Sequence, residues 1–155
     1  MWHFIGLVLL TGVIPFTSPG DGLSEAELIQ KAEAFIHAKN ARQQPNTTME
    51  DLDNFIALFA DDFVDEHLTF NVTITSKDEL RKGMLAKLAD TVYFCEITID
   101  QIMVGHNVAF VKNTEHARVK PSHTDRAIEY SSTNIVSLEF NGDGLITHLR
   151  RHHGQ

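Results

Sequence analysis

The chain has 155 residues, which is the length of one domain with a substantial hydrophobic core. Its formal net charge of -8 and the lack of any Lys/Arg-rich run argue against nucleic acid or an anionic membrane surface as a partner. Cys95 is the only cysteine, which excludes an intrachain disulfide and a thiolate-rich metal site. These features leave a single domain, in which the lone cysteine of a strand-like run is most often a small buried apolar residue.

The first twenty residues have the pattern of a targeting segment. Residues 2–16 are almost entirely apolar and uncharged, and the small, turn-forming residues 17–20 follow. This pattern predicts a signal peptide over residues 1–20, a domain over residues 21–155, and a secreted or periplasmic protein that leaves the membrane after cleavage. The Lys or Arg that usually precedes the apolar run is missing, so an uncleaved anchor is the alternative, although the run is short for a membrane span.

Three stretches in the first half of the chain are predicted to be helices. Each begins with a capping box, in which Ser or Thr is followed three residues later by Glu, and each continues into an apolar stripe. The predicted helices cover residues 24–42, 47–59 and about 76–88. In the second helix, the apolar residues recur at the i, i+3, i+4, i+7 spacing of one buried face.

Alternating patterns predict strands in the rest of the chain. A first strand begins at Phe63 and continues to Thr73, between the second and third helices. Four more strands follow over residues 91–104, 108–119, 127–140 and 145–152, joined by turn-forming segments at 105–107 and 141–144. Sequential strands joined in this way predict an antiparallel meander, and the overall order predicts an α+β fold.

Asp65 and His67 are the first candidate site residues. Alternation from Phe63 places both side chains on one face of the strand, and a carboxylate beside an imidazole is a natural acid–base pair. We therefore predict a catalytic role for this pair on the concave side of the sheet. The alternatives are that they are solvated residues at a strand end, or that the strand is shifted by one residue, which would bury Val64 and turn the pair to solvent.

The later strands offer binding candidates. On strand 127–140, Tyr130 and Asn134 lie at the polar end of a face that becomes apolar, as expected for a strand lining a pocket. On strand 108–119, His116 shares a face with Lys112 and could meet an anionic ligand, or else belongs to an exposed stripe matched by acidic residues. His148, on the last strand, is a candidate to polarise a carbonyl group.

The face opposite this predicted pocket side carries apolar residues. Ala109, Val111 and Ile135 are expected there, where they would leave apolar area uncovered. Such area predicts a homodimer formed through the outer face of the sheet.

The histidine-rich ending, residues 148–153, invites comparison with metal sites. The adjacent His152 and His153 lie on opposite faces of a regular strand, and no recognised metal-binding motif completes a site. The sequence also lacks a glycine-rich phosphate loop and a Gly-x-Ser-x-Gly nucleophile motif. We therefore predict no metal and no cofactor.

The order of these elements resembles the nuclear transport factor 2-like superfamily, and in particular its polyketide-cyclase-like (SnoaL-like) branch. The resemblance covers Ser24 to His153. The segments that carry it are Leu-Phe-Ala-Asp-Asp-Phe at 58–63, the helix opening at 76–81, Gly-His-Asn-Val-Ala at 105–109 and the hairpin at 140–146. It implies a cone, in which three N-terminal helices are packed in a strongly bent, mainly antiparallel sheet with a pocket at the wide end.

The resemblance implies two kinds of function. Enzymes of this superfamily, such as ketosteroid isomerase, scytalone dehydratase and polyketide cyclases, transfer protons in the pocket without a cofactor, whereas other members bind proteins or mediate dimers. We expect a pocket for a small, partly apolar molecule, and isomerisation, dehydration or cyclisation if the protein is an enzyme. Asp65 or His67 would be the base, and Tyr130, Asn134 or His148 would polarise a carbonyl. The alternative is a non-catalytic dimerisation or protein-interaction module, whose cone would be filled by side chains.

Overall fold

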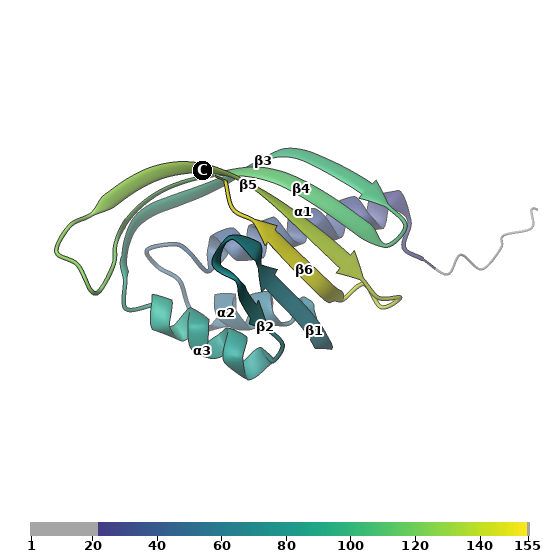
Figure 1. Ribbon diagram of the computed structural model, residues 1–155, viewed down its shortest axis with the longest axis horizontal. Coiled ribbons are helices and arrows are strands. Elements are labelled where there is room, and N and C mark those ends of the chain that lie inside the picture. The colour runs from purple at the N-terminus through teal and green to yellow at the C-terminus, as the bar shows by residue number, and fades with distance from the viewer. Residues whose placement is uncertain (1–21, 155) are drawn as a thin grey trace, which may run out of the picture.

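A computed structural model describes residues 22–154 of the chain, in which one curved sheet wraps around three helices (Figure 1). The predicted signal peptide, residues 1–20, lies outside the described residues. Among the residues that the structure describes, no helix is long and apolar enough to cross a membrane.

The three helices are α1 (Glu25–Ala41), α2 (Met49–Ile56) and α3 (Lys77–Lys87). The caps of α1 and α3 confirm the prediction, whereas α2 is capped by Thr48 with Asp51 instead of the predicted Thr47 with Glu50. Ser24, Thr48 and Ser76 are the N-cap residues, and each side chain accepts a hydrogen bond from the backbone N–H three residues on. The second helix is shorter than predicted, because it ends before Phe59.

The strands form a mixed sheet in the order β2-β1-β6-β5-β4-β3. Only β1 and β6 pair in parallel, so the sheet is mainly antiparallel and the predicted α+β fold is confirmed. The bounds are β1 (Phe59–His67), β2 (Val72–Ile74), β3 (Thr91–Gly105), β4 (Val108–Lys120), β5 (Ile128–Phe140) and β6 (Ile146–His152).

The first predicted strand differs from the observed structure at both ends. It begins at Phe59 instead of Phe63, because the Ile146 N–H donates to the Leu58 carbonyl at 2.9 Å and draws this segment into the sheet. It also stops at His67, where a 3₁₀ turn and the left-handed Asn71 (φ 51°) reverse the chain into β2. Asn tolerates this backbone conformation better than most residues do.

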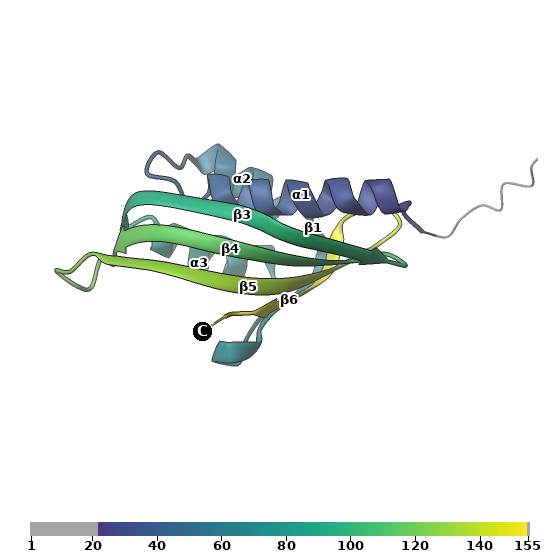
Figure 2. The same ribbon diagram turned by 90° about the horizontal axis from the view of Figure 1, so that it is seen from above.

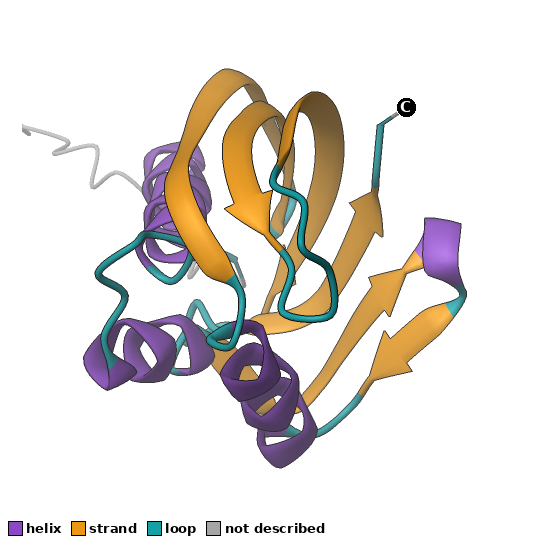
Figure 3. Ribbon diagram, turned by 90° about the vertical axis from the view of Figure 1, so that its left-hand side faces the viewer, coloured by secondary structure: helices purple, strands orange, loops and turns teal. Residues whose placement is uncertain are grey.

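The sheet bends strongly, as Figure 3 shows from one end. Register shifts interrupt the β3–β4 ladder after Val92 and again after Ile99, and such bulges increase the local twist and bend of a strand. Helix α1 runs along β3 and β4 on the concave side (Figure 2). The result is the cone that the sequence predicts.

Four phenylalanines form the centre of the core. Phe35 of α1, Phe55 of α2, and Phe59 and Phe63 of β1 are essentially inaccessible to solvent. Their ring centroids lie 5.6, 5.3 and 4.9 Å apart along the series, in tilted contacts that aromatic rings favour. This series joins α1 and α2 to strand β1 of the sheet.

The faces of two strands follow from this packing. Phe63 and Asp65 are buried on the concave side, as predicted, and the register that would bury Val64 instead is wrong. The prediction for Ala109 and Val111 is also wrong: both are fully buried on the concave side. Their small side chains leave room for α1 to pack against β4, whereas Ile135 faces outward and is exposed, as expected.

Leu52→Ala should destabilise the protein by about 2–5 kcal/mol, because Leu52 is 1% exposed in the core and its truncation leaves a cavity. Urea unfolding followed by circular dichroism measures this change. The same truncation at Leu85, which is 41% exposed on α3, is the control and should change the free energy of unfolding by less than about 1 kcal/mol. Equal losses at both positions would contradict the assignment of this core.

Candidate functional site

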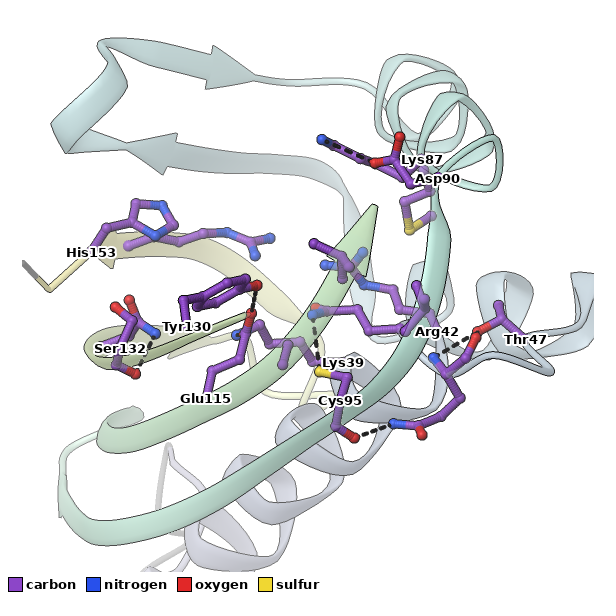
Figure 4. A pocket seen from close by; sticks show the side chains of 18 of the residues that line it. Lys39, Arg42, Thr47, Lys87, Asp90, Cys95, Glu115, Tyr130, Ser132 and His153 are labelled. Carbon is purple, nitrogen blue, oxygen red and sulfur yellow. Dashed lines mark hydrogen bonds and ion pairs between the residues drawn. The ribbon is translucent and has the colours of Figure 1, made fainter. Parts of the chain in front are cut away.

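A cavity of about 660 Å³ opens at the wide end of the cone (Figure 4). Its walls come from the C-terminal end of α1 and the loop after it, from α3, from the concave faces of β3, β4 and β5, and from the end of β6. One part of the lining is apolar, and it consists of Pro45, Phe70, Met84, Leu88, Val92, Ala117, Val119 and Val136. The rest is polar and contains most of the charged groups discussed below.

Two cationic side chains at the C-terminal end of helix α1 line the cavity. The buried stripe of this helix continues from Phe35 to Lys39 and Arg42, at the spacing that keeps side chains on one face of a helix. The Lys39 Nζ donates to Glu115 Oε2 at 2.7 Å, in an ion pair that is almost buried. Burial lowers the pKa of Lys39, and the neighbouring Glu115 opposes that shift.

Glu115 of β4 is 8% exposed, and its carboxylate accepts hydrogen bonds from two side chains. Lys39 occupies one carboxylate oxygen, and the Tyr130 hydroxyl donates to the other at 2.8 Å. Burial alone would raise the pKa of Glu115, but the charge and hydrogen bond of Lys39 and the bond from Tyr130 lower it overall. Burial and the adjacent Glu115 raise the pKa of Tyr130, so its hydroxyl stays protonated at neutral pH.

Asp65 is completely buried and bound to Arg151 of β6. Arg151 Nε donates to Oδ1 at 2.8 Å and its Nη2 donates to Oδ2 at 2.7 Å, a bidentate pair. Burial would raise the pKa of Asp65, but His67 and Arg151 beside it bring the pKa down to about 2. Asp65 is therefore a permanent carboxylate whose two oxygens are both engaged.

His67 lines the cavity next to this ion pair. Its Nε2 lies 3.6 Å from Asp65 Oδ1, and its Nδ1 lies 3.4 Å from Nε2 of His153, whose ring stacks on it. Its side chain is 23% exposed, so one edge of the ring remains accessible. Burial and the neighbouring His67 lower the pKa of His153, which keeps that ring neutral at pH 7.

Two other polar residues at this end have distinct environments. The Arg42 guanidinium lies 4.4 Å from the centre of the Phe55 ring, and its buried Nε has no hydrogen-bond partner. Burial lowers the pKa of Arg42 to about 10, which leaves it charged at neutral pH. Burial also raises the pKa of Cys95 to about 11, so its thiol is protonated and a poor nucleophile.

The structure brings four of the six predicted site residues to the concave side. Asp65, His67, Tyr130 and Asn134 lie there, and all but Asp65 line the cavity itself. The Asn134 amide donates to the Ser132 carbonyl at 3.3 Å and accepts from the Gly154 N–H at 3.2 Å. Asn134 thus holds the C-terminal segment against the cavity wall.

His116 and His148 lie on the outer face of the sheet and do not line this cavity. His116 Nε2 is 3.3 Å from Glu129, and His148 Nε2 is 2.7 Å from Glu66. The reason is the alternation of β4 and β6, whose concave-facing residues here are Glu115 and Arg151 instead. Within residues 22–154, no group of three or more His, Cys, Asp or Glu side chains gathers as metal ligands do.

Four charged residues of this site were not among the residues predicted from the sequence: Lys39, Arg42, Glu115 and Arg151. A signal for two of them was present, since Lys39 and Arg42 continue the 28-32-35 stripe of α1 at intervals of four and three residues. Glu115 has a similar signal, because it follows Ala109 and Val111 on alternate positions of β4. The sequence gives no signal for Arg151, because Arg150 and Arg151 are adjacent and alternation does not say which of the two faces the cavity.

The chain belongs to the SnoaL-like domain family, whose match covers residues 32–149. That span contains Lys39, Asp65, His67, Glu115 and Tyr130. Among curated proteins, no sequence matches this chain.

Solved structures show the same fold. An LEH-like epoxide hydrolase from Mycobacterium tuberculosis has a TM-score of 0.62 and 21% identity, over 83% of each chain. A ketosteroid isomerase-like protein from Erwinia carotovora has a TM-score of 0.61 and 17% identity, over 83% of this chain and 94% of the other. A nuclear transport factor 2-like protein from Burkholderia pseudomallei has a TM-score of 0.64 and 14% identity, over 84% and 92%.

Asp65→Asn should destabilise the protein by about 3–5 kcal/mol at pH 7, because Arg151 would remain buried without a counter-charge. The carboxyl pKa is lower in the folded chain than in the unfolded one, so its stabilising effect is present above about pH 4 and is lost as the pH falls toward 2. The difference between wild type and variant should therefore shrink over that window in urea unfolding.

Asp61→Asn is the matched control, because the Asp61 side chain pairs with Lys77 at 2.7 Å but is 97% exposed. Because this pair is exposed, the free energy of unfolding of the variant should differ from that of the wild type by less than about 1 kcal/mol at every pH. A deficit of Asp65→Asn that stayed constant down to pH 2 would contradict the role assigned to this carboxylate.

Proposed function

We propose that this is an exported protein that binds a small, partly apolar molecule in the cavity and transfers a proton on it without a cofactor. The uncharged run at residues 2–16 supports export. The observation that carries the proposed function is the cavity itself, in which apolar walls meet a histidine backed by a buried carboxylate. A purely structural cone would be filled at this point by side chains.

His67 is the proposed general base. With its Nε2 toward Asp65, His67 can accept a proton from a carbon acid at Nδ1 when the bound molecule replaces the 3.4 Å contact with His153, and the Asp65 carboxylate stabilises the imidazolium that forms. Asp65 is a positioning residue and not the base, because Arg151 occupies both of its oxygens. This assignment selects one of the two candidates that the sequence left open.

Other residues of the cavity supply groups for the developing negative charge. The Lys39 ammonium uses one of its three hydrogens for Glu115, which leaves hydrogens for an enolate-like oxygen. Tyr130 and Asn134 also line the cavity and are the proposed binding contacts. Isomerisation, dehydration and cyclisation all need such a base and such a stabilised oxygen.

The comparisons support this class of function without selecting the reaction. The similar structures include an LEH-like epoxide hydrolase and a ketosteroid isomerase-like protein, so the fold occurs in an enzyme named for a small-molecule reaction. Identity at this level shows the fold alone. The proposal therefore depends on the residues in the cavity of this chain.

We also propose that the protein forms a homodimer through the outer face of the sheet. Met103 of β3, Phe110 of β4 and Ile135 of β5 are between 45% and 56% exposed there. Met103 and Phe110 are direct cross-strand partners, and Ile135 pairs with Lys112, two residues from Phe110. Side chains of this kind on one sheet face are typical of a covered interface.

The proton transfer can be tested with 5-nitrobenzisoxazole. Its isoxazole ring opens when a base in an apolar site removes the one proton that this ring carries. The wild-type protein should accelerate this reaction, and His67→Gln should lower the rate by about 100-fold or more. The melting temperature of His67→Gln should stay near that of the wild type, because His67 contributes little to the core.

His106→Gln is the control, since His106 is an exposed histidine in the turn between β3 and β4. Its rate should equal that of the wild type. Equal rates for wild type and His67→Gln would refute His67 as the base.

Light scattering at micromolar concentration should give the mass of a dimer for the wild-type protein. Ile135→Lys should give a monomer, because a charge would replace an apolar side chain at the centre of the proposed interface. Leu85→Lys, on the exposed side of α3, should remain a dimer. A monomer mass for the wild type would refute the proposed dimer.

A further inference from the structure

The charges around the cavity do not balance. Four cations line it, and three of them have a carboxylate partner: Lys39 pairs with Glu115, Arg151 with Asp65, and Lys87 with Asp90 at the rim. Arg42 is the fourth. Within residues 22–154, no carboxylate lies within ion-pair distance of its guanidinium, so the cavity has one surplus positive charge.

Arg42 is also held in a defined position. Its guanidinium packs over the Phe55 ring at 4.4 Å, and α1 ends at Ala41, so the backbone of Arg42 is the helix C-cap. Its Nε is buried and has no acceptor among the described residues. An unsatisfied buried donor on a charged group is costly. Because this Nε is closed to solvent, a ligand would meet the Nη1 and Nη2 groups at the end of the side chain, which have no acceptor within residues 22–154.

We infer that Arg42 binds the carboxylate of the ligand, and that the natural ligand is therefore a partly apolar monocarboxylic acid. The planar guanidinium matches a carboxylate, which can accept two parallel N–H bonds from it. One surplus positive charge balances a monoanion and would leave a phosphate group only partly neutralised. The apolar wall that includes Met84, Leu88 and Val119 accommodates the rest of the molecule.

The net charge of the protein does not explain binding of an anion. Its formal net charge is -8, so the long-range field repels anions, and an anion-binding cavity in such a chain requires a local cause. Arg42 is that cause. This inference depends on the proposed function, because it names the class of molecule that the same cavity takes.

The test uses an uncharged fluorescent probe and two competitors that differ in charge only. N-phenyl-1-naphthylamine reports whether the cavity binds an apolar molecule, and 2-naphthoate and 2-naphthamide compete with it. For the wild-type protein, the carboxylate should displace the probe at about a tenfold lower concentration than the amide, as one charge-assisted bidentate interaction would give.

Arg42→Gln should abolish this difference while the probe still binds. Arg42→Lys should retain part of it, because Lys keeps the charge and loses the planar pair of donors. Arg81→Gln is the matched control: it makes the same substitution outside the cavity, at a surface residue paired with Asp53, and should leave the tenfold preference unchanged. The melting temperature of Arg42→Gln should be no lower than that of the wild type, since the variant removes a buried cation without a partner.

The outcomes separate this inference from the function on which it depends. If the probe binds but the carboxylate and the amide compete equally, the inference is overturned and the small-molecule cavity stands. If Arg81→Gln reduces the preference as much as Arg42→Gln does, net charge is the cause and the inference is also overturned. If the probe does not bind the wild-type protein at all, the proposed function itself fails.

Discussion

One concave sheet face has to serve both as the wall of the core and as the wall of the cavity, and the rest of the structure depends on this constraint. At the narrow end, the four phenylalanines fill the space between sheet and helices. At the wide end, the same strands continue with polar residues. Along β4 the concave face changes from Val111 to Glu115, and along β5 it changes from Leu138 to Tyr130. A gradient of this kind allows a single sheet to be stable and open at once.

The polar half of this face is stabilised by ion pairs within the protein. Charges removed from water destabilise a fold unless each has a counter-charge and hydrogen bonds. Lys39–Glu115 and Asp65–Arg151 satisfy both conditions, and each joins elements that are distant in sequence. They fix the end of α1 against β4 and fix β1 against β6. Arg42 is the exception, and its unmatched charge is the feature of the cavity that a bound anion would compensate.

The same ion pairs decide which group remains free for chemistry. A base must have an unoccupied lone pair that faces the ligand. Asp65 and Glu115 have no such freedom, because Arg151, Lys39 and Tyr130 already donate to their oxygens. His67 is different, since its Nε2 faces Asp65 at 3.6 Å and its Nδ1 has only a 3.4 Å contact with His153, which a bound molecule can replace. The carboxylates therefore organise the site, and the imidazole is the group available to react.

The sequence by itself determined the three helices and the order of the long strands along the chain, and it favoured the side of β1 that carries Asp65 and His67. It did so because capping residues, stripes and alternation are local patterns that each segment expresses without its neighbours. It also identified the polar end of β5 with Tyr130 and Asn134. Only the tertiary structure decided which face of β4 is concave, that β6 pairs with β1 in parallel, and that Lys39 meets Glu115. Both faces of β4 mix apolar and polar residues, so alternation defines two faces but does not say which one α1 covers. That choice depends on contacts between residues as far apart as Lys39 and Glu115, and no local pattern encodes them.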